Sequence, residues 1–157
     1  MSGMEKEANY QLLAKQVDSL LEGEDNIMGQ LANAAAIIHD TLHAWWTGFY
    51  VVKGEELLLG PFQGPVACYR IKRGRGVCGT AWQENRTLVV PDVEQFPGHI
   101  ACSSLSRSEI VVPLRDSQGE VIAVLDIDSR ELAAFDYVDA RGLEAVCHAI
   151  EQHAFKS

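Results

Sequence analysis

Residues 108–129 read SEIVVPLRDSQGEVIAVLDIDS, and this segment is the strongest single indication of the fold. Two runs rich in valine, isoleucine and leucine, 109–115 and 120–127, are typical of buried strands. The tetrapeptide Asp-Ser-Gln-Gly at 116–119 separates them, and these residue types favour a tight turn. The segment therefore predicts an antiparallel β-hairpin.

The second strand of this hairpin carries two carboxylates near its end. Side chains alternate between the two faces of a strand, so Asp126 and Asp128 share one face with Ile122 and Val124. Ionised carboxylates are costly to bury without partners. We therefore expect both aspartates either at a solvated rim of the sheet or beside a cation.

Helical periodicity marks both ends of the chain. Apolar residues repeat three and four positions apart in about residues 9–21, and again from about 27 to 42. Asp25 or Asn26 can cap the second of these helices, and Asp136 can cap a further helix near the C-terminus. We expect all three helices to pack on a sheet as scaffold.

Strand-like runs occupy the middle of the chain, at 46–52, 57–59, 66–71 and 87–90. The glycine- and proline-containing segment 60–64 predicts a break in the second of them, and 91–107 predicts a long functional loop. These elements together predict an α+β domain. We expect a central antiparallel sheet with helices on one face and a ligand pocket on the other face, under that loop.

Composition and length limit the class of protein. A chain of 157 residues with 47% apolar and 22% charged residues fits one globular domain, 1–157, with its core at about 9–154. It has no apolar run long enough to span a bilayer and begins with a polar segment, so we expect a cytoplasmic protein with no membrane partner. The net charge of −9 would repel polyanions, and the basic cluster at 70–75 has no interleaved aromatic residues. Nucleic acid is therefore not an expected partner.

Four cysteines are the candidate reactive groups. In a reducing compartment thiols are buried, catalytic or metal-binding more often than they form structural disulfides. Cys147 lies on the apolar stripe of the C-terminal helix, which indicates a core position. Cys102 lies near His99 in the long loop, and Cys68 and Cys78 precede it. Cys78 falls in the first turn of a short helix that follows a glycine-rich segment, where the helix macrodipole would lower its pKa.

Three kinds of chemistry could use these groups. The three cysteines with His99 offer zinc ligands, but no Cys-x-x-Cys pair of the usual structural zinc site is present. Hydrolysis by Cys102 and His99 would leave the other two cysteines without a role. Thiol redox chemistry uses all three, because one thiolate attacks an oxidised substrate and becomes a sulfenic acid, and a second thiol condenses with it to a disulfide. An external dithiol must then reduce that disulfide.

An aromatic pair on the first strand has two possible roles. Trp46, Gly48 and Tyr50 share one face of that strand. Aromatic side chains in strands usually belong to the core. Two of them on either side of a glycine could also wall a pocket for an apolar ligand, because the missing side chain leaves room.

Six motifs carry a family resemblance, and they are WTGFY at 46–50, LGPFQG at 59–64, GRGVCGT at 74–80, GHIAC at 98–102, SEIVVPL at 108–114 and VLDIDS at 124–129. With these motifs the sequence closely resembles the free methionine-(R)-sulfoxide reductases, which are stand-alone GAF-domain enzymes. The resemblance covers about residues 9–153. The glycine-rich turn and the hairpin are general GAF features, whereas three cysteines together with Gly-His-Ile-Ala-Cys are specific.

The resemblance implies a GAF-like fold and a set of roles. It implies that Cys102 is the nucleophile and becomes the sulfenic acid, and that Cys68 or Cys78 resolves it. It implies a substrate pocket formed by Trp46, Tyr50, Glu109, Asp126 and Asp128. We expect free methionine-(R)-sulfoxide as substrate, a thioredoxin-type dithiol as external reductant, no metal and no bound cofactor. Related proteins of this family look dimeric, so the resemblance implies a homodimer as a further partner.

The acidic residues suit two features of that substrate, its ammonium group and its sulfoxide oxygen. A free amino acid carries an ammonium group that a residue within a polypeptide lacks, and carboxylates select for it through charge-assisted hydrogen bonds. The sulfoxide oxygen leaves only when it is protonated, so a general acid is needed. Crowded like charges raise a carboxyl pKa, and we therefore expect Glu109 or Asp126 to stay protonated and act as that acid.

Two other functions remain as alternatives. The first is a non-catalytic GAF module that senses a small cation or amino acid. Such sensors normally drive an attached output domain, and we expect no second domain here. The second is a peroxide-type thiol sensor acting through Cys102 alone, which would react with oxidants generally and without stereochemical preference.

Overall fold

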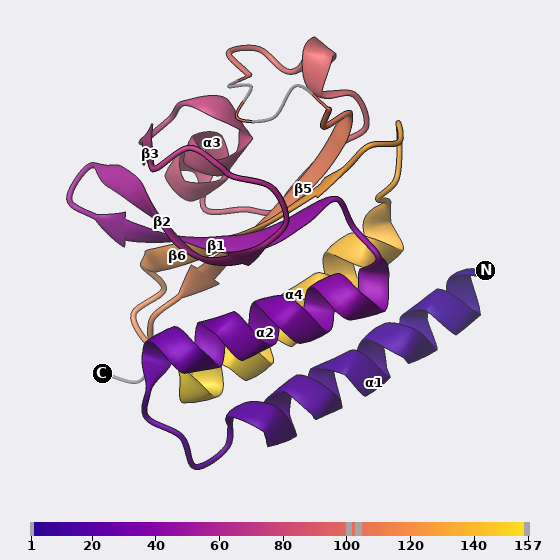
Figure 1. The fold of residues 1–157 in the computed structure, drawn as a ribbon, viewed down its shortest axis with the longest axis vertical. Helices are drawn as coiled ribbons and strands as arrows, with labels where there is room; N and C mark the ends of the chain where they lie inside the picture. The colour runs from indigo at the N-terminus through magenta and orange to yellow at the C-terminus, as the bar shows by residue number, and fades with distance from the viewer. Residues whose placement is uncertain (1, 100–101, 103–104, 156–157) are drawn as a thin grey trace.

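A computed structural model describes residues 2–99, 102 and 105–155. It contains four α-helices, one 3-10 turn and six strands among these residues: α1 Gly3–Leu21, α2 Ile27–Leu42, β1 Trp46–Lys53, β2 Glu56–Gln63, β3 Arg70–Lys72, α3 Gly76–Glu84, β4 Leu88–Val90, η1 Val93–Gln95, β5 Ser108–Arg115, β6 Val121–Ser129 and α4 Tyr137–His153. Figure 1 shows the sheet between two layers, with α1, α2 and α4 on one side and α3 with the long loop on the other.

The strands form one antiparallel sheet in the order β3-β2-β1-β6-β5-β4. The hairpin expected from residues 108–129 is confirmed as β5 and β6. Asp116 closes its turn, because Oδ1 accepts from the backbone N–H groups of Gln118 at 2.9 Å and Glu120 at 3.0 Å. Gly119 follows with φ of 82°, a left-handed conformation that glycine adopts readily. In the strand order, the hairpin lies near the centre of the sheet, where it can present residues to both faces.

The predicted break at 60–64 is wrong, since β2 continues through Gly60 and Pro61 to Gln63. Gly48 pairs with Phe62 and Tyr50 pairs with Leu59, so two residues of β2 lie opposite the single residue Phe49. This is a β-bulge, and a bulge accommodates a proline that cannot donate to the ladder. Glycine and proline therefore mark an irregularity within the strand and not its end.

The strand predicted at 66–71 is mostly loop, because regular pairing begins only at Arg70. The first helix is longer than expected and begins at Gly3, with the Ser2 hydroxyl accepting from the backbone N–H of Glu5 at 3.1 Å. Its first turns are polar and have no apolar periodicity, which explains the missed start. Lys6 fastens them by an ion pair with Asp139 at 2.6 Å.

The caps predicted for the second helix and for the C-terminal helix are both present. Asn26, one of the two candidates, caps α2 by accepting from the backbone N–H of Gly29 at 3.3 Å. Asp136 caps α4 in a capping box with Asp139. These caps fix where the helices meet the sheet.

Alternation along the strands divides the core in two. Phe49, Ile110 and Leu125 pack with α1, α2 and α4, whereas Trp46, Tyr50 and Val124 face α3 and the long loop. Cys147 is buried in the first cluster, as its place on the helix predicts. No helix in the described part of the chain has the length and apolarity to cross a membrane. The antiparallel sheet with its main helices on one face is confirmed (Figure 1), and the predicted pocket residues of β1, β5 and β6 lie on the opposite face.

Candidate active site

A cavity of about 50 Å³ lies on the α3 side of the sheet. Three neighbouring strands supply five of its predicted residues, because Gly48 pairs with Asp126, Trp46 pairs with Asp128, and Glu109 pairs with Asp128 across the ladder. The cavity is lined by seven of the eight candidate residues, Trp46, Tyr50, Cys78, Cys102, Glu109, Asp126 and Asp128. The structure thus brings together groups that lie up to 82 positions apart in the sequence, 128 − 46.

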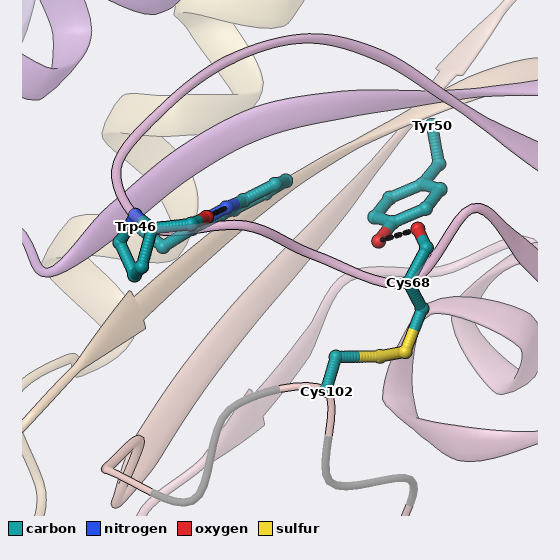
Figure 2. The surroundings of a disulfide bond; sticks show 5 residues. Trp46, Tyr50, Cys68 and Cys102 are labelled. Carbon is teal, nitrogen blue, oxygen red and sulfur yellow. Dashed lines mark hydrogen bonds between the residues drawn. A yellow bond between two sulfur atoms is a disulfide. The ribbon is translucent and has the colours of Figure 1, made fainter.

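Two aromatic side chains form one wall of this cavity and hold a loop in place (Figure 2). The Trp46 indole Nε1–H donates to the carbonyl oxygen of Pro65 at 3.0 Å, and the Tyr50 hydroxyl donates to that of Cys68 at 2.8 Å. The Trp46 and Tyr50 ring centroids are 6.0 Å apart. Gly48 lies between them, and a Cβ atom there would clash with the Trp46 ring and Phe62. The glycine is therefore required for this wall, and the aromatics serve both the core and the pocket.

A disulfide joins Cys68 to Cys102, with Cα atoms 5.4 Å apart (Figure 2). Cys68, the eighth candidate residue, reaches the cavity through this bond. Cys78 is a free, buried thiol. The part of the GHIAC motif that the structure describes is residues 98, 99 and 102, so its Ile100 and Ala101 lie outside the described residues. The geometry therefore pairs Cys102 with the first of the two thiols that the sequence left as alternatives.

The expected low pKa of Cys78 is wrong. Burial raises the pKa of this thiol well above its ordinary value, and the carboxylates of Asp126, Glu109 and Asp128 raise it further. Cys78 does lie in the first turn of α3, as predicted. The macrodipole contribution there is small next to full desolvation beside three acidic groups. The thiol is neutral and suited to donate a hydrogen bond, not to act as a nucleophile.

Three carboxyl groups crowd the floor of the cavity. Glu109 and Asp126 are each only 6% exposed, and Asp128 is half-buried. Burial raises the pKa of Glu109 well above its ordinary value, and the neighbouring charges of Asp126 and Asp128 add to this. Burial also raises the pKa of Asp126, but hydrogen bonds from Glu109 and Cys78 oppose that rise. Burial likewise raises the pKa of Asp128 well above its ordinary value, so Asp126 is the carboxyl of the three that ionises most readily.

One oxygen in this cluster has no partner. Among the residues that the structure describes, no hydrogen bond reaches Oδ1 of the buried Asp126 side chain. The Sγ atom of Cys78 and one carboxyl oxygen each from Glu109 and Asp126 lie within 4.8 Å of one another. A buried acceptor without a donor is costly, so the cluster is suited to receive a cationic donor from a ligand. That no metal binds here stays a prediction.

The raised pKa of Glu109 has a consequence for stability. A carboxyl whose pKa is higher in the folded than in the unfolded state stabilises the fold below its unfolded pKa and loses that contribution as pH rises towards its folded pKa. We expect Glu109→Gln to raise the free energy of unfolding at pH 7 by about 1 kcal/mol or more. Denaturation of the disulfide-linked protein at pH 4 and pH 7 measures this, and the gain should shrink at pH 4. Glu120→Gln, at an exposed glutamate of the hairpin turn, is the matched control and should change neither value.

Sequence reasoning missed two polar residues of the cavity, Ser106 and Arg75. The Ser106 hydroxyl donates to Oδ1 of Asp128 at 3.3 Å and helps lower its pKa against the dominant effect of burial, which raises it. Arg75 precedes α3, and no side chain in the described part of the sequence caps that helix. Both lie in loops with no periodic pattern. In the sequence, these two residues could have been identified only by their positions, Ser106 in the loop that carries Cys102 and Arg75 in the glycine-rich motif.

The other two interpretations of the cysteines find less support. Hydrolysis would need the Cys102 thiol to be activated by His99. The Cys102 sulfur is instead bonded to Cys68, although His99 also lines the cavity. Burial lowers the pKa of His99, and the nearby Asp126 carboxylate opposes this. The close group of metal-capable donors in the described part of the chain contains Cys78 but neither Cys68 nor Cys102. The zinc set predicted as an alternative is therefore not assembled.

Known proteins resemble this chain over most of its length. The GAF domain family matches residues 27–153. "GAF domain-containing protein A" of Dictyostelium discoideum is 54% identical over 93% of this chain and 92% of its own length. The "Free methionine-R-sulfoxide reductase" of Saccharomyces cerevisiae is 41% identical over 96% of this chain and 88% of its own length. The crystal structure of the free methionine-R-sulfoxide reductase from Neisseria meningitidis in complex with its substrate is 48% identical, with a TM-score of 0.92 over 96% of this chain and 90% of that one.

These similarities extend over nearly the full length of each protein and confirm the GAF-like fold. The three-cysteine set, the acidic cluster and the aromatic wall lie in one cavity of that fold. The chain therefore belongs to the free methionine-R-sulfoxide reductase family, whose members are built on a GAF domain.

Proposed function

We propose that this protein reduces free L-methionine-(R)-sulfoxide to L-methionine, with Cys102 as the nucleophile. The observation that supports this most is the placement of a disulfide between Cys68 and Cys102 at a cavity lined by three carboxyl groups. The disulfide provides two-electron redox chemistry, and the carboxyl groups provide recognition of a free amino acid. The substrate reacts with the reduced protein, because attack on its sulfur requires a free Cys102 thiolate.

Recognition begins with the ammonium group of the substrate. It donates to Asp126, whose Oδ1 atom has no partner among the described residues, and to Asp128 at the rim. Charge-assisted hydrogen bonds of this kind are strong, particularly where water is excluded. A sulfoxide within a peptide has no ammonium and would leave the Asp126 carboxylate buried without a partner. The site therefore selects the free amino acid.

The substrate carboxylate has a candidate site at the start of α3. Arg75 lines the cavity, and the first backbone N–H groups of α3 are free of a side-chain cap. A guanidinium and a helix N-terminus both favour a carboxylate. The Trp46 and Tyr50 rings then hold the apolar part of the substrate between the two charged ends.

Removing the guanidinium should therefore weaken substrate binding. We expect Arg75→Gln to raise KM for the free sulfoxide about tenfold, the loss expected for one charge-assisted hydrogen bond, with a smaller change in kcat. Steady-state kinetics measures both constants. Arg86→Gln removes an exposed arginine that follows the C-terminal end of α3 and is the control. An unchanged KM in Arg75→Gln would remove this residue from the substrate site.

The reaction follows from the same groups. The Cys102 thiolate attacks the sulfoxide sulfur while protonated Glu109 donates its proton to the sulfoxide oxygen. The S–O bond to methionine breaks and oxygen passes to Cys102, so one thiol and one sulfoxide become one sulfenic acid and one sulfide. The Cys68 thiol then condenses with the sulfenic acid, which forms the disulfide and releases water. The disulfide and the neutral, buried state of Cys78 both support Cys68 as the resolving thiol.

A dithiol must restore the two thiols after each turnover. A thioredoxin-type protein supplies two electrons and two protons and leaves as a disulfide. This recycling agrees with a reducing compartment such as the cytoplasm.

The function is tested by NADPH consumption in the presence of thioredoxin and thioredoxin reductase. The substrates are free L-methionine-(R)-sulfoxide, its S epimer and a peptide that contains the sulfoxide. We expect turnover with the free R epimer alone. Turnover with the peptide at a similar rate would contradict the role given to the acidic cluster. Binding without turnover of any substrate would instead favour a sensing module.

A further inference from the structure

We propose that exposed apolar residues beside Cys68 form the surface on which the external dithiol protein docks, and that its thiolate attacks the sulfur of Cys68. This inference rests on the proposed function, which requires the Cys68–Cys102 disulfide to be reduced after each turnover. It adds the place of contact and the sulfur that is attacked.

The docking surface consists of Val66, Tyr69 and Leu105. Val66 and Tyr69 lie on either side of Cys68 in the loop between β2 and β3, and their exposed fractions are 88% and 81%. Leu105, three residues after Cys102 on the other arm of the disulfide, is also exposed. Single exposed apolar residues are common on protein surfaces. These three lie within three residues of one or the other cysteine of a reducible bond, so a partner that reaches that bond must come close to them.

The loop that carries this surface is held from the cavity side. Trp46 binds the carbonyl of Pro65, and Tyr50 binds that of Cys68 (Figure 2). The backbone N–H of Leu59 donates to the carbonyl of Tyr69 at 2.9 Å. The backbone is therefore fixed while the Tyr69 side chain extends into solvent. A surface ordered before binding has less conformational entropy to lose on contact.

The direction of exchange favours attack on Cys68. Thiol–disulfide exchange forms a mixed disulfide with the attacked sulfur and releases the other as a thiolate. Attack on Cys68 joins this residue to the partner and breaks its bond to Cys102. The Cys102 thiolate is then released beside the cavity, where the next substrate needs it. The partner's second thiol attacks the mixed disulfide, the partner leaves as a disulfide, and Cys68 takes up a proton.

The surrounding charge indicates what the partner's surface contains. The chain has a net charge of −9, but four of its basic residues follow Tyr69 directly, within 70–75. Arg70 and Arg73 pair with Glu56 and Glu55, and Lys72 and Arg75 add positive charge to this edge. An apolar patch beside a basic edge is complementary to a dithiol protein whose reactive cysteine has apolar surroundings with acidic residues at their rim.

Tyr69→Ser is the decisive variant, and the chain offers a matched control. Tyr137, on α4 at the opposite face of the sheet, is 79% exposed and can be changed to serine in the same way. The disulfide-linked proteins are reduced, without any sulfoxide, either by thioredoxin with its reductase and NADPH or by dithiothreitol. We expect Tyr69→Ser to lower kcat/KM for thioredoxin about tenfold, as for loss of one aromatic anchor, with no change for dithiothreitol. Tyr137→Ser should match the unchanged protein with both reductants.

A thioredoxin that lacks its second cysteine traps the mixed disulfide, and peptide mapping should place it on Cys68. A trapped bond to Cys102, an unchanged thioredoxin rate in Tyr69→Ser, or an equal loss with dithiothreitol would overturn the proposal. Failure of the proposed function is separate from these results. It would appear as no methionine formed from the free sulfoxide with dithiothreitol as reductant, an assay in which Tyr69→Ser should equal the unchanged protein.

Discussion

Replacing Cys102 with serine is expected to abolish sulfoxide reduction, whereas replacing Cys68 with serine should permit one turnover and no more. The Cys102→Ser variant has no thiolate to attack the sulfoxide sulfur. Loss of a nucleophile lowers kcat by on the order of a thousandfold or more. Cys68→Ser keeps the nucleophile, so one methionine forms and Cys102 remains a sulfenic acid. Methionine release and a sulfenic acid probe, both in a single turnover, measure the two outcomes.

Cys78→Ala is the matched control for these variants. Its thiol is buried and neutral and takes no part in the Cys68–Cys102 bond. We expect the variant to form that disulfide with substrate and to retain turnover within about tenfold, since it loses one weak hydrogen-bond donor to Asp126. If Cys68→Ser sustained many turnovers with thioredoxin while Cys78→Ala stopped after one, the assignment of the resolving thiol would be reversed.

The second large effect is expected at Glu109. Glu109→Gln removes the proton that the sulfoxide oxygen requires, and loss of a general acid typically lowers kcat by about 10²–10⁴-fold. The amide has nearly the same volume and remains a hydrogen-bond donor, so substrate binding through Asp126 should persist. Single-turnover rates of methionine formation with saturating free sulfoxide provide the test.

The rate of methionine formation should depend on pH in a direction set by Glu109. The acid acts in its protonated form and Cys102 acts as a thiolate, so the rate of the chemical step should rise from low pH as the thiolate forms and fall as pH rises through the folded-state pKa of Glu109. Burial and two neighbouring carboxylates raise that pKa well above its ordinary value, which places the fall far above the range of an exposed glutamate. Glu109→Gln should lose this alkaline limb. A variant with the wild-type rate and the wild-type profile would exclude Glu109 as the acid.

The same residue links activity to stability. An acid kept protonated by burial costs stability at neutral pH, so the variant that loses activity is the one expected to resist unfolding better. Sites that hold groups in an unfavourable ionisation state commonly show this opposition. A joint measurement of unfolding free energy and turnover on Glu109→Gln would show both.

Sequence alone predicts the parts of this molecule that depend on local pattern. Alternation along two strands places Trp46 with Tyr50 and Asp126 with Asp128, and strand pairing then brings the two pairs together. Helix caps at Asn26 and Asp136 are likewise local. The continuation of β2 through Gly60 is not local, because the bulge exists only where β2 pairs with β1 on either side of Phe49.

The electrostatics of the site also depend on tertiary contacts. The place of Cys78 in the first turn of a helix predicts a low pKa, yet three carboxyl groups from β5 and β6 and the loss of solvent reverse the direction. The choice between Cys68 and Cys78 as partner of Cys102 requires distances that no spacing provides. Arg75 and Ser106 lie in irregular segments and enter the cavity only through the folded loops.

The most direct test of the central claim is a single turnover with fully reduced protein, free L-methionine-(R)-sulfoxide and no external reductant. We predict one methionine per chain and the loss of two of the four thiols, with peptide mapping that places the new bond between Cys68 and Cys102. Cys78 and Cys147 should remain free. Release of methionine with a bond that includes Cys78, or loss of the two thiols without methionine, would contradict the account.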